Sequence, residues 1–242
     1  MRSRRSFAVF AAQDDGRVPA RRSNTISRRM AAKQRLILLA AAVVALAAWL
    51  LWPSPYRRVA NLGSHGTGII AFGDSLTAGY GAQPGDDYPS KLSSMIGTSI
   101  VNAGVSGDTT ESALARIDGD VVARGPRIVI VGLGGNDFLQ GVPLATTERN
   151  LRSIIRAVHA AGAMVVLLGF RFPSLSANYD KMYASVAGDE RCLLVPDLLD
   201  GIMANPSLKS DEIHPNARGY ALMAERISGP CRKLIAKADA AR

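Results

Sequence analysis

Net charge is small over most of this chain, and the location of the excess limits the partners that can be expected. Residues 1–35 hold nine Arg and one Lys against Asp14 and Asp15, a net of +8 within a total of +9 for the 242 residues. Only +1 is left for residues 36–242. A protein that binds nucleic acid usually concentrates positive charge on a folded face, so nucleic acid is not an expected partner. The composition of residues 1–35 is typical of a disordered basic tail.

Cysteine and histidine are also scarce, with two and three copies. No Cys stands directly after the apolar run at residues 36–52, so a lipoprotein anchor is not indicated. His65 lies in a Gly-rich segment, and His159 lies on a charged helical face near Arg156. Both are therefore expected to be surface residues. His214 is therefore the histidine to consider for chemistry. No internal repeat is present.

The one long apolar run, residues 36–52, has the sequence LILLAAAVVALAAWLLW. As a helix it is roughly 25 Å long, which is the short end of a membrane span. Seven basic residues lie between positions 17 and 35, whereas only Arg57 and Arg58 follow closely. This asymmetry predicts a single-pass anchor in the inner membrane, with the tail cytoplasmic and the remainder periplasmic.

A cleaved signal peptide is the alternative interpretation of the same run. Ala45-Leu46-Ala47 matches the small-residue pattern of a cleavage site, and cleavage there would release the protein into the periplasm. Met30 begins a more ordinary signal-like segment than Met1 does, so either methionine fits as the start of the chain.

Short apolar segments alternate with helical patterns beyond a linker at residues 53–66. The expected strands are residues 67–72, 99–103, 127–133, 163–170 and 192–196. The expected helices are residues 88–96, 110–123, 147–161, 178–187 and 216–227. Continuously apolar strands alternating with helices are typical of an α/β domain with a parallel sheet covered on both faces. Residues 67–242 are therefore predicted to form one domain with five parallel strands.

Polar residues follow four of these strands directly or after a loop, in the segments 73–76, 104–109, 134–137 and 211–215. The carboxyl ends of parallel strands meet at one edge of a sheet, where ligand sites form. A serine, a histidine, an aspartate and several hydrogen-bond donors are thus expected to converge.

These residue types suit acyl transfer. Ser75 becomes a nucleophile if a base near neutral pKa removes its proton, and His214 is such a base. Asp211, three residues earlier, can orient the imidazole and stabilise its charged form. The backbone N–H groups of Ser75 and Gly107 and the amide of Asn136 are candidate donors to a developing oxyanion.

The blocks FGDSLTAGYG, NAGVSGDT, GGND and DEIHPN together resemble the ordered signatures of the SGNH or GDSL hydrolases. The similarity extends from about residue 69 to 220 and is greatest to the small bacterial arylesterase and acyl-CoA thioesterase/lysophospholipase group. It implies a three-layer, flavodoxin-like fold, with no metal or organic cofactor. It also implies Ser75, Asp211 and His214 as the triad, and Gly107 and Asn136 as oxyanion-hole donors.

The same resemblance implies an acyl groove near the serine. Its expected walls are Leu76, Phe138, Arg171, Phe172 and Ile213. Related enzymes often have Arg-Leu-Pro where this chain has Arg171-Phe172-Pro173, and the stretch 179–191 is shorter here, which predicts a bulkier wall and a more open groove.

The expected activity is hydrolysis of an aryl ester, a lysophospholipid or an acyl thioester through an acyl-serine intermediate. Deacetylation of a cell-envelope polysaccharide is the alternative within enzymes, because the same triad serves both reactions. A binding module that keeps the fold without the chemistry is a minor alternative.

The two cysteines allow two interpretations. Cys192 begins the fifth strand at the amino edge of the sheet, and the last helix runs from His214 back toward that edge and brings Cys231 with it. An exported domain would favour a disulfide between them. A buried thiol and a separate, solitary thiol are the equal alternative.

Overall fold

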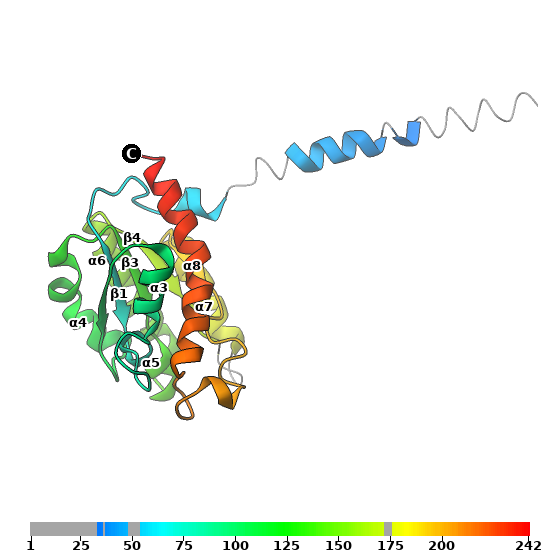
Figure 1. The fold of residues 1–242 in the computed structure, drawn as a ribbon. Helices are drawn as coiled ribbons and strands as arrows, with labels where there is room; N and C mark the ends of the chain where they lie inside the picture. Colours follow the sequence, from blue (N-terminus) through cyan, green and yellow to red (C-terminus); the bar gives the residue numbers. More distant parts are fainter. Residues whose placement is uncertain (1–32, 36, 48–53, 172–175) are drawn as a thin grey trace, which may run out of the picture. The chain divides into compact units, whose positions relative to one another are not determined.

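The computed structural model describes residues 33–35, 37–47, 54–171 and 176–242. The chain divides into two compact units, Met1–Trp52 and Pro53–Arg242. In the first unit, residues 33–35 and 37–47 are helical, with exposed side chains (Figure 1). No helix among the described residues has the length and apolar character needed to span a membrane. Of the predicted anchor at 36–52, residues 36 and 48–52 lie outside the described part, as do residues 1–32 of the predicted tail.

The second unit contains a five-stranded parallel sheet, which confirms the predicted α/β architecture. Its strands are β1 (Ile69–Gly73), β2 (Ile100–Gly104), β3 (Ile128–Gly132), β4 (Met164–Leu168) and β5 (Leu193–Val195). The spatial order is β2-β1-β3-β4-β5, the flavodoxin-like order. Every residue of β1, β3 and β4 is buried, because these strands are continuously apolar and covered on both faces.

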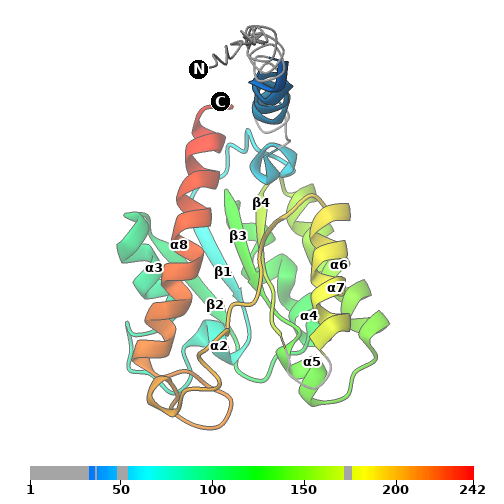
Figure 2. The ribbon, with the colours of Figure 1, turned by 90° about the vertical axis from the view of Figure 1, so that its right-hand side faces the viewer.

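Helices cover the sheet in two further layers (Figure 2). One layer consists of α3 (Tyr88–Ile96) and α8 (Ala217–Asp239), which pack against each other. The other consists of α4 (Thr110–Asp120), α6 (Leu144–Ala160) and α7 (Ser176–Asp189). Two short helices follow strands directly, α2 (Ser75–Ala78) after β1 and α5 (Gly135–Leu139) after β3. The 3-10 turns are η1 (Pro55–Arg58), η2 (Val122–Arg124) and η3 (Pro206–Leu208).

The last helix is longer than the sequence predicts. The expected end was near residue 227, but α8 continues through Pro230 to Asp239. A proline inside a helix removes one hydrogen bond, yet the buried stripe continues beyond it with Cys231, Leu234 and Ala238. Burial of this stripe against the domain offsets the local cost of the proline.

Residues 54–66, predicted to be a linker, pack against the domain. Val59 belongs to the hydrophobic core, and the backbone N–H of Ala60 donates to the carbonyl of Arg191 at 2.9 Å. The side chain of Asn61 donates to the carbonyl of Ala163 at 3.0 Å. These contacts join the start of the folded unit to the amino edge of the sheet.

Both cysteines are free thiols in the structure, so the disulfide interpretation is not realised there. Cys231 is buried in α8, and Cys192 is half-buried just before β5. Burial raises the pKa of each thiol to about 12, which keeps both in the poorly reactive thiol form at neutral pH.

A glycine at the end of β2 sets the position of α2. A Cβ atom on Gly104 would lie 2.2 Å from the backbone nitrogen of Ala78 and 2.6 Å from the carbonyl carbon of Thr77. The side chain of Asn102, on the same strand, donates to the carbonyl of Thr77 at 2.8 Å. Because only a residue without Cβ allows this approach, Gly104 fixes the distance between the end of β2 and the helix that begins with Ser75.

We expect Gly104→Ala to lower the free energy of unfolding by about 1–3 kcal/mol, the usual cost of forcing atoms into a packed site. Denaturant unfolding followed by circular dichroism measures it. Gly119→Ala is the matched control, because Gly119 is helical and exposed with open space around its Cα, and alanine there should stabilise by about 0.5–1 kcal/mol. A Gly104→Ala protein as stable as the parent would show that α2 does not depend on this contact.

Candidate active site

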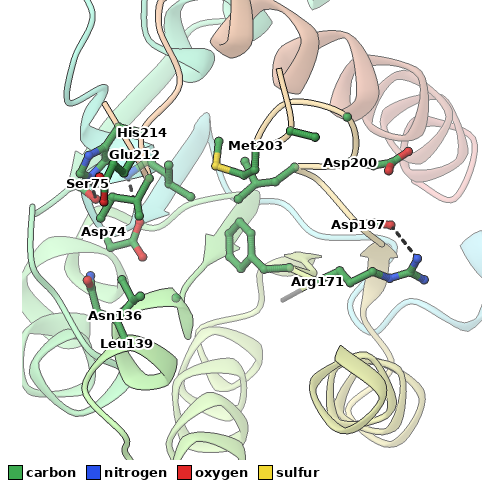
Figure 3. Close-up of a pocket in the computed structure, with 17 residues that line it drawn as sticks. Asp74, Ser75, Asn136, Leu139, Arg171, Asp197, Asp200, Met203, Glu212 and His214 are labelled. Atoms are coloured by element: carbon green, nitrogen blue, oxygen red, sulfur yellow. Dashed lines mark hydrogen bonds and ion pairs between the residues drawn. The ribbon is translucent and has the colours of Figure 1, made fainter. Parts of the chain in front are cut away.

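The segments that follow the strands meet at the carboxyl edge of the sheet and surround a cavity of about 360 Å³. Figure 3 shows Ser75 and His214 on one side of it and Arg171 with Asp197 on the other. The apolar part of its lining comes from α2, α5, the segments that follow β4 and β5, and the loop before α8. It consists of Leu76, Leu139, Phe170, Leu199, Met203, Ala204 and Ile213.

Ser75 is the first residue of α2, and its place is fixed by the ends of that helix. Asp74 caps the helix, its side chain accepting from the backbone N–H of Leu76 at 3.0 Å. Gly79 ends the helix in a left-handed conformation with φ 85°, which glycine adopts without strain. Ser75 is 9% exposed, so its hydroxyl is largely withdrawn from bulk water and faces the cavity.

His214 and Asp211 lie beside Ser75 although they are far away in sequence. His214 Nε2 is 3.0 Å from Ser75 Oγ, and His214 Nδ1 is 2.8 Å from Asp211 Oδ2. A carboxylate only accepts, so Nδ1 carries the proton that is donated to Asp211 and Nε2 is left to accept from the serine hydroxyl. The ring of Tyr80 lies 4.5 Å from the imidazole, centroid to centroid.

The Asp211 carboxylate is held by three hydrogen bonds. Its second oxygen accepts from the backbone N–H groups of Ile213 at 2.9 Å and His214 at 2.8 Å. Desolvation is the largest single influence on its pKa and raises it, but the hydrogen bonds from His214 and the two backbone N–H groups together lower the pKa below its usual value. Asp211 therefore stays ionised beside the imidazole across the neutral range.

Asn136 reaches the cavity from α5. Its Nδ2 donates to the carbonyl of Asp108 at 2.9 Å, and because an amide nitrogen has two hydrogens, one is left for another acceptor. Gly107 lies next to Asp108 with φ 90°, in the loop that follows β2. Ser75 and Asn136 line the cavity, whereas Gly107 is not among its lining residues.

Two buried carboxylates flank these groups. Asp137 accepts from the backbone N–H of Thr110 at 2.8 Å, from the Thr110 hydroxyl at 2.5 Å and from the Thr147 hydroxyl at 3.3 Å. Asp74 is almost completely buried. Desolvation, with added repulsion from Asp108 and Asp137, raises its pKa to about 7 despite its backbone hydrogen bonds. Both carboxylates bond the backbone at helix starts, as a structural role requires.

The predicted groove residues are only partly brought together. Leu76, Arg171 and Ile213 line the cavity. Phe138 does not, because its ring packs edge-on against Tyr179 with centroids 5.6 Å apart. Phe172 lies outside the described residues. Arg171 pairs with Asp180 at 3.1 Å and with Asp197 at 3.4 Å.

The sequence interpretation missed the segment after β5, which supplies Asp197, Leu199, Asp200 and Met203 to the cavity. It follows a strand at the same edge, and that position was the available signal. It also missed Tyr183 of α7, whose buried hydroxyl donates to the carbonyl of Leu133 at 2.8 Å and so supports the turn that leads into α5.

Comparison with known proteins agrees with this geometry. Residues 71–222 match the GDSL-like lipase/acylhydrolase family. Thioesterase 1/protease 1/lysophospholipase L1 of Escherichia coli (strain K12) is 33% identical over 178 residues, covering 69% of this chain and 84% of that protein. Esterase TesA of Pseudomonas aeruginosa is 30% identical over 178 residues, covering 69% and 89%.

Solved structures extend the comparison. The crystal structure of TesA superposes with a TM-score of 0.66 at 29% identity, covering 69% of this chain and 98% of that one. AlinE4, described as an SGNH-hydrolase family esterase, superposes with a TM-score of 0.56 at 37% identity, covering 70% and 95%. The chain therefore belongs to the GDSL-like lipase/acylhydrolase family and is a serine hydrolase of carboxylic esters.

Proposed function

We propose that this protein hydrolyses acyl esters or thioesters through an acyl-serine intermediate, with Ser75 as nucleophile, His214 as general base and Asp211 as the group that orients it. The observation that carries the proposal is the continuous chain of hydrogen bonds from Asp211 through His214 to Ser75, at 2.8 and 3.0 Å, beside an apolar cavity. A serine with this base becomes nucleophilic at neutral pH.

In the proposed first step, Ser75 Oγ attacks the acyl carbon as its proton passes to His214 Nε2. Asp211 stabilises the resulting imidazolium. The negative charge on the carbonyl oxygen is received by the backbone N–H groups of Ser75 and Gly107 and by the free N–H of Asn136. The tetrahedral intermediate then collapses as the bond between the acyl carbon and the leaving oxygen or sulfur breaks. The departing atom takes the proton from His214 and leaves as an alcohol or thiol.

The second step repeats the first with water. His214 removes a proton from a water molecule, which attacks the acyl-serine, and the same donors receive the charge. Collapse releases the carboxylic acid and returns the proton to Ser75. The scheme needs only side chains, backbone donors and water.

The apolar surface of the cavity favours an apolar acyl group as the part of the substrate that binds there. Most of the surface that faces the cavity is apolar, and burying an apolar chain there contributes about 25 cal/mol per Å². The relatives named above as thioesterase, lysophospholipase and esterase fit this substrate class. Deacetylation of a cell-envelope polysaccharide remains the second candidate because the triad chemistry is the same.

We expect Ser75→Ala and His214→Ala each to abolish hydrolysis of p-nitrophenyl esters without unfolding the domain, because neither side chain belongs to the hydrophobic core. A fluorophosphonate probe should label the parent and not Ser75→Ala. The parent should cleave butyrate and longer esters faster than an acetylated glycan. Near-parental turnover by Ser75→Ala would contradict the assignment, and faster release of acetate from the glycan would favour the deacetylase.

Asp74 is proposed as a structural cap whose ionisation opposes folding. Its pKa rises from 3.8 to about 7 on folding, so the folded state holds more protons than the unfolded state in this window. Its contribution to stability is complete below pH 4 and is lost as the pH rises through 7. Asn at this position keeps an oxygen for the N–H of Leu76 and cannot ionise.

We therefore expect Asp74→Asn to gain stability relative to the parent between pH 4 and pH 8. Urea unfolding at pH 4, 6 and 8 measures the difference, and Asp118→Asn, on an exposed part of α4, is the matched control. A difference between Asp74→Asn and the parent that is constant across this range would contradict the raised pKa.

We propose further that residues 36–52 anchor the protein in the inner membrane with the catalytic domain on the periplasmic side. The apolar sequence and the basic residues before it support this orientation. The described residues 37–47 add support, because Ile37, Leu38 and Val44 are each at least two-thirds exposed. Such apolar surface is costly in water.

The anchor proposal predicts that the full chain sediments with membranes, whereas a chain that begins at Ser54 is soluble and active. A periplasm-dependent reporter fused after Arg242 should be active. Activity only of a cytoplasm-dependent reporter would refute the orientation, and an N-terminus at or just after residue 48 in exported protein would identify a cleaved signal peptide instead.

A further inference from the structure

Arg116, on α4, connects the ends of two strands to the loop between β2 and α4. Its Nε donates to Asp108 Oδ2 at 2.6 Å, Nη2 donates to the carbonyl of Gly73 at 3.0 Å, and Nη1 donates to the carbonyl of Ala103 at 3.0 Å. Nη1 also contacts Asp120 at 2.8 Å. The side chain is only 18% exposed, and its guanidinium lies 4.3 Å from the ring centre of Phe72.

The residue that Arg116 holds is the one that orients Asn136. The carbonyl of Asp108 accepts from Asn136 Nδ2 at 2.9 Å. One oxygen of the Asp108 carboxylate accepts from Arg116, and the other accepts from the hydroxyl of Ser112 at 2.9 Å. The Asp108 side chain is 9% exposed. Movement of this carboxylate would move the Asp108 carbonyl and, with it, the amide plane of Asn136.

We propose that Arg116 is a positioning residue for the oxyanion hole: it fixes Asp108, and through the Asp108 carbonyl it directs the second N–H of Asn136 toward the reacting oxygen. This inference rests on the proposed function. The guanidinium suits the task because its planar fork reaches a carboxylate and two carbonyls at once. A lysine keeps the charge but cannot make that set of bonds.

The effect should appear in kcat. Because the donor acts on the transition state, its misplacement leaves substrate binding unchanged. A displacement on the order of 1 Å can cost about 100-fold in rate, so we expect Arg116→Lys and Arg116→Met to lose roughly 10- to 100-fold in kcat with KM unchanged. Asp108→Asn, which weakens the same link, should fall in this range or above it.

A transition-state mimic separates positioning from general destabilisation. A trifluoromethyl ketone forms a hemiketal oxyanion with the serine, so its inhibition constant should rise in parallel with the loss in kcat/KM across these variants. Concentrations are normalised by fluorophosphonate labelling at its end point, which counts only folded, reactive enzyme. The pH profile of kcat should keep its shape, because the contacts of Arg116 do not include His214 or Asp211.

Arg152→Met is the matched control. Arg152 has a similarly buried side chain, 17% exposed, and bonds Glu148, Asp189 and Glu190 between α6 and α7. Its removal should lower Tm and leave kcat per labelled site unchanged. If Arg116→Lys behaves in the same way, with lower Tm but parental kcat and inhibition constant, Arg116 is only structural and the proposal is overturned.

A double-mutant cycle tests the route. Asn136→Ala alone should lose about 10² to 10³ in kcat, and adding Arg116→Lys should then cost much less than it does in the parent. Fully multiplicative losses would overturn the proposal, because Arg116 would then act independently of Asn136. If Ser75→Ala is inactive while the Arg116 variants keep full activity, this inference is refuted and the proposed function stands.

Discussion

The hydrogen bond between Ser75 Oγ and His214 Nε2 joins residues 139 positions apart. The positions of β1 and α8 bring these two residues together. Ser75 begins the helix after β1, and His214 precedes α8, which returns over the sheet. The hydroxyl of Tyr220, in the first turns of α8, donates to the carbonyl of Tyr80 at 2.8 Å and joins the two segments. The loop with His214 is closed at its base by the bridge between Lys209 and Pro215.

Several polar groups at this edge hold the protein's own backbone and side chains, and Asp74 does so while it also lines the cavity. Asp74 caps α2, Asp137 bonds the start of α4, and Asp108 contacts Arg116 and Ser112. Burying carboxylates is unfavourable unless each is bonded, and the raised pKa of Asp74 reflects that cost. Hydrogen-bond donors that are fixed before the reaction need no reorganisation when charge develops. The cost of burying these carboxylates is thus linked to holding the donors in place.

The strands, and the residues that meet at the cavity, could be predicted because both leave local signals. Five short segments rich in apolar residues mark the strands. Ser75 and Asn136 stand in the short helices that follow two of them, and His214 stands in the longer loop that follows the fifth. The helices α2 and α5, of four and five residues, are too short to show a helical period. The continuation of α8 past Pro230 and the packing of Phe138 against Tyr179 depend on tertiary contacts, which override the local pattern.

The two sides of the cavity differ in how firmly they are built, and this difference bears on specificity. On the Ser75 side, Gly104 permits direct backbone contact between β2 and α2, and Arg116 ties the neighbouring loop to both strand ends. On the other side, the cavity is lined by the loop after β5, where Asp200 is exposed. Loops of this kind tolerate substitution better than the elements that they join. Ser75 thus lies on the side fixed by strand ends, and differences in substrate choice among related enzymes are expected to arise from the loop after β5.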